Sequence, residues 1–304
     1  MEQRDCPYAS SFPVEELDVQ FSDGFALQLI MKDLSPEAMP DAARRSRPGF
    51  LYDARREIEV YRWLLPHAPA GTATLYGAFI NAPARRYWLF LERVSGLELR
   101  HVGTFSIWES AARWIARFHG SLSPTVVASL LPASRLLVYD EAYYWRWLER
   151  ARQFVGSRAR TRKIVDRIAV AYESVVRRLL EMPRTLIHGE FYPCNIVVSR
   201  ATRRVRVCPV DWEMAAFAPP LMDLASLTTG WNRRAQNALV RAYRAATAHG
   251  ATASSVPDDF ARDLDCCRLH LAVRMLGWSK AWQPPPQHAY NWLDEAVRIA
   301  GRLH

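Results

Sequence analysis

Three oxygen-bearing side chains in the second half of the chain have a spacing that suits phosphoryl transfer. Residues 186–198 read LIHGEFYPCNIVV, so Asn195 follows Glu190 by five residues, and Asp211 follows Asn195 by sixteen. A loop that enters a short strand at residues 196–198 and returns through a hairpin would bring Asn195 and Asp211 to one cleft. One amide oxygen and one carboxylate suit Mg²⁺, which completes its octahedron with water and phosphate oxygens. Glu190 would act in the same cleft as a base or an orienting carboxylate.

Two charged residues nearer the N-terminus add to this set. The chain has 37 arginines but only three lysines, and Lys32 lies inside a predicted strand. Glu57 falls on the apolar stripe of a predicted helix over residues 53–65, whereas Glu59 falls off that stripe. A carboxylate on a buried face needs a cationic partner, and we expect Lys32 to be that partner. Such a pair positions nucleotide phosphates. Taken alone, Lys32 is better explained as a snorkelling residue at a strand end.

The predicted secondary structure that must position these residues changes from strands to helices near residues 92–96. Before this connector the sequence predicts strands over residues 12–33, 72–80 and 86–94. After it the sequence predicts long helices over residues 106–120, 140–155 and 161–181, then the β insertion that carries Glu190, then more helix. We therefore predict an α+β, bilobal fold, with a β-rich N-terminal lobe over residues 1–94 and a mainly helical C-terminal lobe over residues 95–304.

These residues, in this order, resemble a known family. The stretches HGEFYPCN, VDWE and PPLMDLA, together with Lys32, Glu57 and a LERV connector, are similar to the aminoglycoside phosphotransferase/choline kinase family, which has a protein-kinase-like fold. The resemblance covers most of the chain. It implies a Mg²⁺-dependent O-phosphotransferase that moves the γ-phosphate of ATP or GTP to a hydroxyl of an aminoglycoside, an amino sugar or another metabolite or antibiotic.

The resemblance also implies a role for each matched residue. Glu190 would be the catalytic base, and Asn195 and Asp211 would hold Mg²⁺. Lys32, paired with Glu57, would hold the nucleotide phosphates. The backbone of Glu92 and Val94 would bind the adenine edge, and Ile30 and Leu91 would lie near the adenine face. His188 and Asp223 would support the loop by hydrogen bonds.

Two departures from the family's pattern leave a second function open. The base position holds Glu190 where aspartate is commonest, and no glycine-rich phosphate loop precedes Lys32. Ser10 and Ser11 stand in place of that loop and would offer hydroxyl and backbone donors to phosphate, although an ordinary serine-rich turn explains them equally. The alternative is a kinase-like protein, catalytically weak or inactive, that binds a ligand or a partner.

The acceptor of the phosphate stays open at this stage. Aromatic side chains in the last third would stack on a ring, although core packing accounts for most of them. An acidic cluster would suit a polycation, and the solvated start of a helix explains it equally. The residues concerned are Trp231, Trp278, Trp282, Tyr290 and Trp292, and the acidic residues Asp258, Asp259, Asp263 and Asp265.

The composition argues against several other classes of protein. Half of the 304 residues are hydrophobic and 23% are charged, as in globular proteins, and no run of about 18 apolar residues predicts a membrane span. The first residues lack the basic and apolar regions of a secretory signal. Five cysteines without a CxxC pair favour a reduced, cytoplasmic setting over zinc or disulfides.

The net charge of +9 is uneven along the chain. Residues 1–94 hold 11 basic and 13 acidic residues, whereas the rest holds 29 and 18. Ten basic residues lie between Arg146 and Arg178, where solvated helix faces explain them better than nucleic acid does, because no aromatic residues suited to base stacking alternate with them. We expect no nucleic-acid partner.

Overall fold

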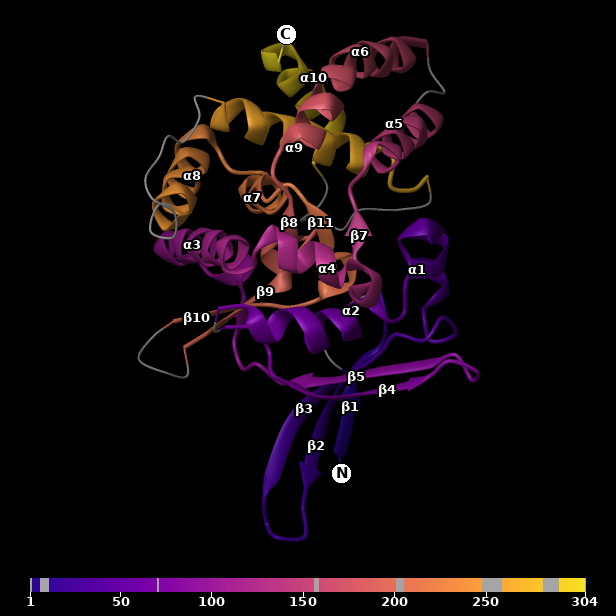
Figure 1. Cartoon of the computed structure of the whole chain (residues 1–304), viewed down its shortest axis with the longest axis vertical. Coiled ribbons are helices and arrows are strands. Elements are labelled where there is room, and N and C mark those ends of the chain that lie inside the picture. The colour runs from indigo at the N-terminus through magenta and orange to yellow at the C-terminus, as the bar shows by residue number, and fades with distance from the viewer. Residues whose placement is uncertain are drawn as a thin grey trace.

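The computed structural model describes residues 2–5, 11–69, 71–155, 159–200, 205–247, 259–280 and 290–303. Within these residues a β-rich N-terminal part and a helical C-terminal part follow one another along the long axis of the molecule (Figure 1). The predicted α+β, bilobal, protein-kinase-like architecture is confirmed.

The described N-terminal sheet is antiparallel, with the strand order β1-β2-β3-β5-β4. In β3, alternation of side chains between the two faces puts Ile30 and Lys32 on the same face. β1 is only four residues long. The strands are β1 (Glu2–Asp5), β2 (Val14–Gln20), β3 (Ala26–Asp33), β4 (Leu75–Asn81) and β5 (Arg86–Glu92).

The helical segment predicted over residues 53–65 has three parts. It runs as an α-helix, α2 (Arg56–Glu59), as a π-helical turn over Val60–Leu64 and as a 3₁₀ turn over Leu65–His67. The prediction that Glu59 lies off the buried face is wrong, because its side chain is only 4% exposed. Its carboxylate accepts hydrogen bonds from Arg55 at 2.6 Å and from the Trp63 indole at 2.9 Å, which compensate its burial.

The chain passes from one part to the other directly after β5. Residues 93–96 lead into β6 (Leu97–Glu98), which pairs with β9 (Ile196–Ser199), and β9 pairs with β10 (Arg206–Pro209). At Gly96 a Cβ atom would lie 2.3 Å from the carbonyl oxygen of Val198, so only glycine permits this close approach. The boundary at residues 92–96 stays a prediction, with which this strand pairing is compatible.

Helices and a second small sheet build the C-terminal part (Figure 1). The three predicted helices are present, with ends shifted by one or two residues. Helix α4 was missed, because it has no apolar stripe and Pro132 lies inside it. The elements are α3 (Phe105–Ser121), α4 (Pro124–Ser134), β7 (Leu137–Val138), α5 (Glu141–Val155), α6 (Ala159–Glu181), β8 (Thr185–Ile187), β11 (Ala216–Ala218), α7 (Leu221–Thr228), α8 (Arg233–Thr247), α9 (Phe260–Leu276) and α10 (Trp292–Leu303), with a further short helix, α1 (Asp41–Ser46), in the N-terminal part.

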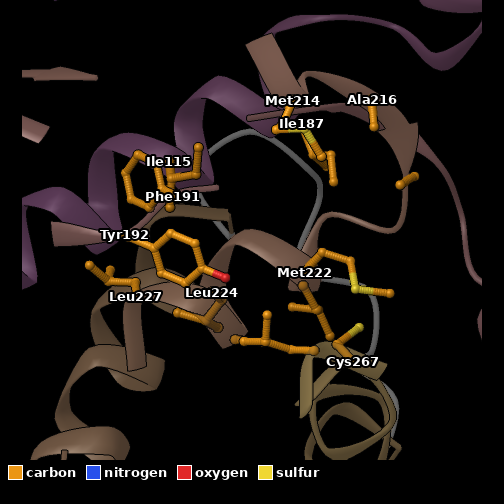
Figure 2. Close-up of a cluster of buried hydrophobic side chains, with 14 of the residues drawn as sticks. Ile115, Ile187, Phe191, Tyr192, Met214, Ala216, Met222, Leu224, Leu227 and Cys267 are labelled. Carbon is orange, nitrogen blue, oxygen red and sulfur yellow. The ribbon is translucent and has the colours of Figure 1, made fainter. Parts of the chain in front are cut away.

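The core of the C-terminal part lies directly beneath the HGEFYPCN loop. Phe191 and Tyr192, which follow Glu190, are 0% and 7% exposed. Figure 2 shows both side chains in a buried cluster with residues of α3, α7 and α9, among them Ile115 and Leu224. Burying two aromatic side chains favours one loop conformation by several kcal/mol, at roughly 1.5–3 kcal/mol for a fully buried phenylalanine. The loop is therefore anchored by its own apolar residues.

No helix among the described residues combines the length and the apolarity needed to cross a membrane.

Candidate active site

A cavity of about 970 Å³ is lined by residues of both parts of the chain. Most of the predicted site residues line it. His188 and Asp223 instead lie behind the loop, each 0% exposed. Ser10 lies outside the described residues. The predicted residues that line the cavity are Ser11, Ile30, Lys32, Glu57, Leu91, Glu92, Val94, Glu190, Asn195 and Asp211.

Lys32 joins the two parts of the chain across this cavity. Its Nζ lies 2.7 Å from Glu57 Oε2 and also contacts Asp211 Oδ1. The other Glu57 oxygen accepts a hydrogen bond from the backbone N–H of Trp212 at 3.1 Å. Burial acts to lower the pKa of Lys32, but the carboxylates of Asp211 and Glu57 outweigh it and raise that pKa above its usual value. Lys32 therefore stays charged, and β3, α2 and the residues after β10 form one ionic network.

Asn195 and Asp211 lie side by side at the ends of β9 and β10. The backbone N–H of Val210 donates to the Asn195 carbonyl at 2.9 Å, next to the Ile196–Pro209 pair of the ladder. Asp211 has a φ of 67°, a left-handed conformation that costs a non-glycine residue about 1 kcal/mol or more. One carboxylate and one amide in adjacent positions are a donor set that fits Mg²⁺, with water and phosphate to complete it.

The HGE loop is held by a single buried carboxylate. Asp223 accepts hydrogen bonds from the backbone N–H of His188 at 2.8 Å and of Gly189 at 2.9 Å. His119, which the sequence reasoning missed, adds a contact from its Nε2 at 3.0 Å. Gly189 has a φ of +82°, and a Cβ there would lie 2.1 Å from the carbonyl oxygen of Met214. Only glycine fits, so the loop has one geometry.

His188 supports the loop from its side chain as well. Its Nε2 lies 2.9 Å from the Val210 carbonyl oxygen, and its Nδ1 lies 3.3 Å from the backbone N of Glu190. Burial lowers the pKa of His188, which favours the neutral ring with its proton on Nε2. In that form it donates to Val210 and accepts from Glu190, and so it links the loop to the strand that leads to Asp211.

The carboxylate of Glu190 contacts an arginine that the sequence reasoning did not select. Arg274 of α9 is 3% exposed; its Nη1 donates to the Gly189 carbonyl at 2.9 Å, and its Nη2 contacts Glu190 Oε1. Burial raises the pKa of Glu190 to about 7, against the opposing charge of Arg274. A carboxylate with a pKa near neutrality suits general-base work. The available signal was an arginine within the apolar run LHLAVRML.

At the far end of the cavity the connector offers fewer backbone groups than the sequence implied. The N–H of Glu92 already donates to the Thr74 carbonyl at 2.8 Å. Its carboxylate pairs with Arg206 at 2.5 Å, which holds the end of β5 against β10. Because the Glu92 N–H is already paired, the backbone groups that we still expect to meet an adenine edge are the Glu92 carbonyl and the backbone of Val94.

The acidic cluster lies away from the cavity. Within the described residues, Asp259 and Asp263 pair with Arg178 of α6, at 3.1 and 2.6 Å. Asp265 pairs with Arg268 and with Arg302 of α10. These carboxylates are neutralised by helix-to-helix pairs, so the cluster offers no described pocket for a polycation; Asp258 lies outside the described residues.

The aromatic residues mostly pack in the core, as the simpler interpretation had it. Trp231 packs edge-on against Phe105 and Trp108, and Trp292 is 9% exposed. Trp278 stacks on Trp147 and also lines the cavity. Tyr290 is 39% exposed, and Trp282 lies outside the described residues.

The comparisons with known proteins bear on this geometry. A model of the phosphotransferase enzyme family matches residues 42–258, more than half of the chain and across both lobes. The chain belongs to this phosphotransferase family. The resemblance read from the motifs is therefore confirmed. The comparison of this phosphotransferase with curated proteins found no match.

Solved structures share the fold of this phosphotransferase at low sequence identity. Choline kinase LicA from Streptococcus pneumoniae has a TM-score of 0.64 at 12% identity, covering 99% of this chain and 94% of that one. A microcompartment-associated aminopropanol kinase has 0.63 at 15%, covering 99% and 90%. The GDP complex of aminoglycoside 2'-phosphotransferase-IIIa has 0.63 at 13%, covering 100% and 92%.

Proposed function

We propose that this phosphotransferase moves the γ-phosphate of ATP or GTP to a hydroxyl of a small molecule, with Mg²⁺ as the metal. The observation that carries the proposal is that Lys32, Asn195, Asp211 and Glu190 all line one cavity. The similar structures support it, since they are named as kinases of choline and aminopropanol and as an aminoglycoside phosphotransferase bound to GDP.

The residues of the cavity divide the work of phosphoryl transfer, which needs positioning and charge neutralisation. Lys32 would bind the non-transferred phosphates, and Asn195 and Asp211 would hold Mg²⁺, which supplies positive charge to the phosphate oxygens. Glu190 would accept the proton of the acceptor hydroxyl. The oxygen of that hydroxyl would bond to the γ-phosphorus as the bond from the γ-phosphorus to the nucleoside diphosphate breaks. Arg274 would hold one oxygen of the Glu190 carboxylate and leave the other for the acceptor.

The contact with Arg274 also gives a reason for glutamate at the base position. Glutamate reaches one methylene further than the commoner aspartate, by more than 1 Å. Displacements of this size affect rates when the carboxylate is unsupported. Here the guanidinium of Arg274, which also donates to the Gly189 carbonyl at 2.9 Å, fixes the carboxylate at that longer reach.

The alternative is a kinase-like protein that binds a ligand without turnover. The observation in its favour is that internal cations already contact both acids of the site, Arg274 at Glu190 and Lys32 at Asp211. The same ion pairs also suit an enzyme before its substrates bind. Turnover that depends on Glu190 separates the two functions.

Thermal unfolding with Mg²⁺ and ATP or GTP tests the donor half of the proposal. A ligand that binds only the folded state stabilises it by about 2.7 kcal/mol at 100-fold over Kd. We expect a Mg²⁺-dependent rise in Tm that Asp211→Asn removes and Glu190→Gln retains. No rise with either nucleotide at millimolar concentration would refute nucleotide binding.

Transfer of labelled γ-phosphate to a panel of hydroxylated acceptors tests the other half. Glu190→Gln should lower turnover by roughly 10²–10⁴-fold, the usual contribution of a positioned base, while nucleotide binding stays nearly unchanged. Equal turnover in the two proteins would remove Glu190 from the role of base.

A further inference from the structure

The cavity contains a second buried arginine that the roles above leave unused. Arg47 directly follows α1, and Figure 1 shows this helix apart from the five-stranded sheet. The Arg47 side chain is only 6% exposed, yet it lines the same cavity as Lys32, Asp211 and Glu190. A buried cation at this place needs a reason.

The guanidinium of Arg47 is incompletely paired. Its Nη1 donates to Glu213 Oε2 at 2.7 Å, and among the residues that the structure describes its Nη2 meets only the weak acceptor Met214 Sδ, at 3.9 Å. Its buried Nε finds no hydrogen-bond partner among the described residues. A buried donor left unpaired costs about 1–3 kcal/mol, so native proteins rarely keep one without a purpose. An anion in the cavity would give the terminal N–H groups of Arg47 an acceptor beyond Glu213.

Arg47 shares the cavity with the residues to which the proposed function assigns the transfer. Its charge interacts most strongly with Glu213 and also with Glu190 and Asp211, the proposed base and metal ligand. The Phe12 ring lies 5.6 Å from its Cζ, a cation–π contact that helps to fix the guanidinium. Glu213 and Phe12 thus hold the guanidinium in the cavity that the proposed base and metal ligand also line.

The segment before β2 also lacks the glycine-rich phosphate loop of the family's pattern. Residues 6–13, between β1 and β2, read CPYASSFP and contain no glycine. A terminal phosphate in transfer carries charge on three oxygens that must be neutralised. A guanidinium fork binds two phosphate oxygens at once, so one well-placed arginine can supply donors of the kind that a glycine-rich loop provides.

We propose that Arg47 is a catalytic residue that binds the terminal, transferred phosphate of the nucleotide. This inference rests on the proposed function. Glu213 holds Arg47 in position through Nη1, and the remaining N–H groups meet the phosphate. The contact forms with a nucleoside triphosphate and has no counterpart with a diphosphate.

Titration calorimetry with Mg²⁺ complexes of non-hydrolysable ATP and GTP analogues and of ADP and GDP tests the inference. In Arg47→Gln we expect the affinity for the triphosphate to fall about tenfold or more, as for a lost hydrogen bond to a charged group. The affinity for the diphosphate should stay within about twofold. The matched control is Arg45→Gln, which removes the same charge from an exposed position of the same segment.

Two further comparisons keep the test decisive. Arg47→Lys retains a charge without the fork and should recover part of the triphosphate affinity, so it serves if Arg47→Gln does not fold in a thermal scan. Equal loss of triphosphate and diphosphate affinity, or loss of neither, would overturn the role of Arg47. Failure of the wild-type protein to bind any of the four nucleotides would instead overturn the proposed function itself.

Discussion

The two ends of the cavity are held in place in different ways. At the end where we propose that the nucleotide phosphates bind, called the donor end, Lys32 of β3 reaches Asp211, 179 residues away, and Glu57 of α2 reaches the backbone of Trp212. At the end that carries the proposed base, called the acceptor end, the loop with Glu190 is held by Asp223, His119 and Arg274, all from the helical part. The donor end therefore depends on how the two lobes meet, whereas the acceptor end is preorganised within one lobe.

This difference predicts which substitutions affect folding and which affect the nucleotide. Removing a support of the acceptor end leaves buried donors unpaired within the core of the C-terminal lobe. Removing a support of the donor end exposes its partners to a cavity that water and phosphate can enter. Substitutions at Asp223 and at Lys32 test this distinction.

The largest effect is expected at Asp223. Asp223→Ala should lower the free energy of unfolding by about 3–5 kcal/mol, as for a buried charge network that loses one member. It leaves two backbone N–H groups and His119 without their acceptor. Urea unfolding measures the loss; Asp223→Asn, which keeps one acceptor oxygen, should lose less. A change below about 1 kcal/mol in Asp223→Ala would show that the loop is held by other contacts.

A smaller effect on folding, with a larger one on ligand, is expected at Lys32. Lys32→Met should lower the free energy of unfolding by about 1–3 kcal/mol. The side chain of Asp211 is 20% exposed and can be solvated, and Glu57, whose pKa burial raises to about 7, can bind a proton once its cation is removed. Nucleotide affinity should fall about tenfold or more. Lys163→Met, at an exposed position of α6, is the control. Unchanged nucleotide affinity in the calorimeter would remove Lys32 from the donor site.

The smallest effect is a dependence of stability on pH from His270 of α9. The ring is 1% exposed, and its Nδ1 lies 2.7 Å from the Tyr172 hydroxyl. Its Nε2 has no partner among the described residues. The rings of Tyr139, Tyr143 and Tyr144 surround it. Burial, and secondarily the charge of Arg274, lowers the pKa of His270 from 6.5 to about 3.

The sign of this effect follows from proton binding. Between pH 6.5 and about 3 the unfolded chain binds a proton at residue 270 that the folded protein does not, so stability falls as the pH falls. The slope is at most about 1.4 kcal/mol per pH unit. Denaturant unfolding at pH 6 and pH 5 measures it. His270→Phe should reduce the slope and His101→Phe, at an exposed residue, should not; equal slopes in all three proteins would exclude His270.

The sequence predicted those site residues whose type and spacing are unusual for this chain. Lys32 is one of three lysines, and Glu57 lies on an apolar stripe, so each signals a partner. Arg47 gave no such signal among 37 arginines, and Arg274 gave only its place in the apolar run LHLAVRML. Their contacts lie 166 and 84 residues away, and only the folded chain brings them to Glu213 and Glu190.

Alternation and helical periodicity in the sequence predicted the fold, but they did not predict whether each individual side chain is buried. The burial of Glu59 was predicted wrongly because the apolar stripe does not show which polar residues can pair with it. Arg55 and Trp63, one turn away on either side, supply the hydrogen-bond donors that allow its carboxylate to be buried. The interpretation of the acidic cluster stayed open for a similar reason. Its partners Arg178 and Arg302 come from other helices, and their positions depend on tertiary packing.

The close approach at Gly96 determines where the molecule can bend. Because Gly96 lies against the Val198 carbonyl and the two residues after it pair with β9, the chain from Gly96 onward moves with the C-terminal lobe. Within the connector, a hinge rotation between the lobes would then have to occur about the backbone bonds of residues 93–95. Val94, whose backbone we expect to meet the nucleotide base, is one of these residues, so a bound nucleotide would stiffen the hinge itself.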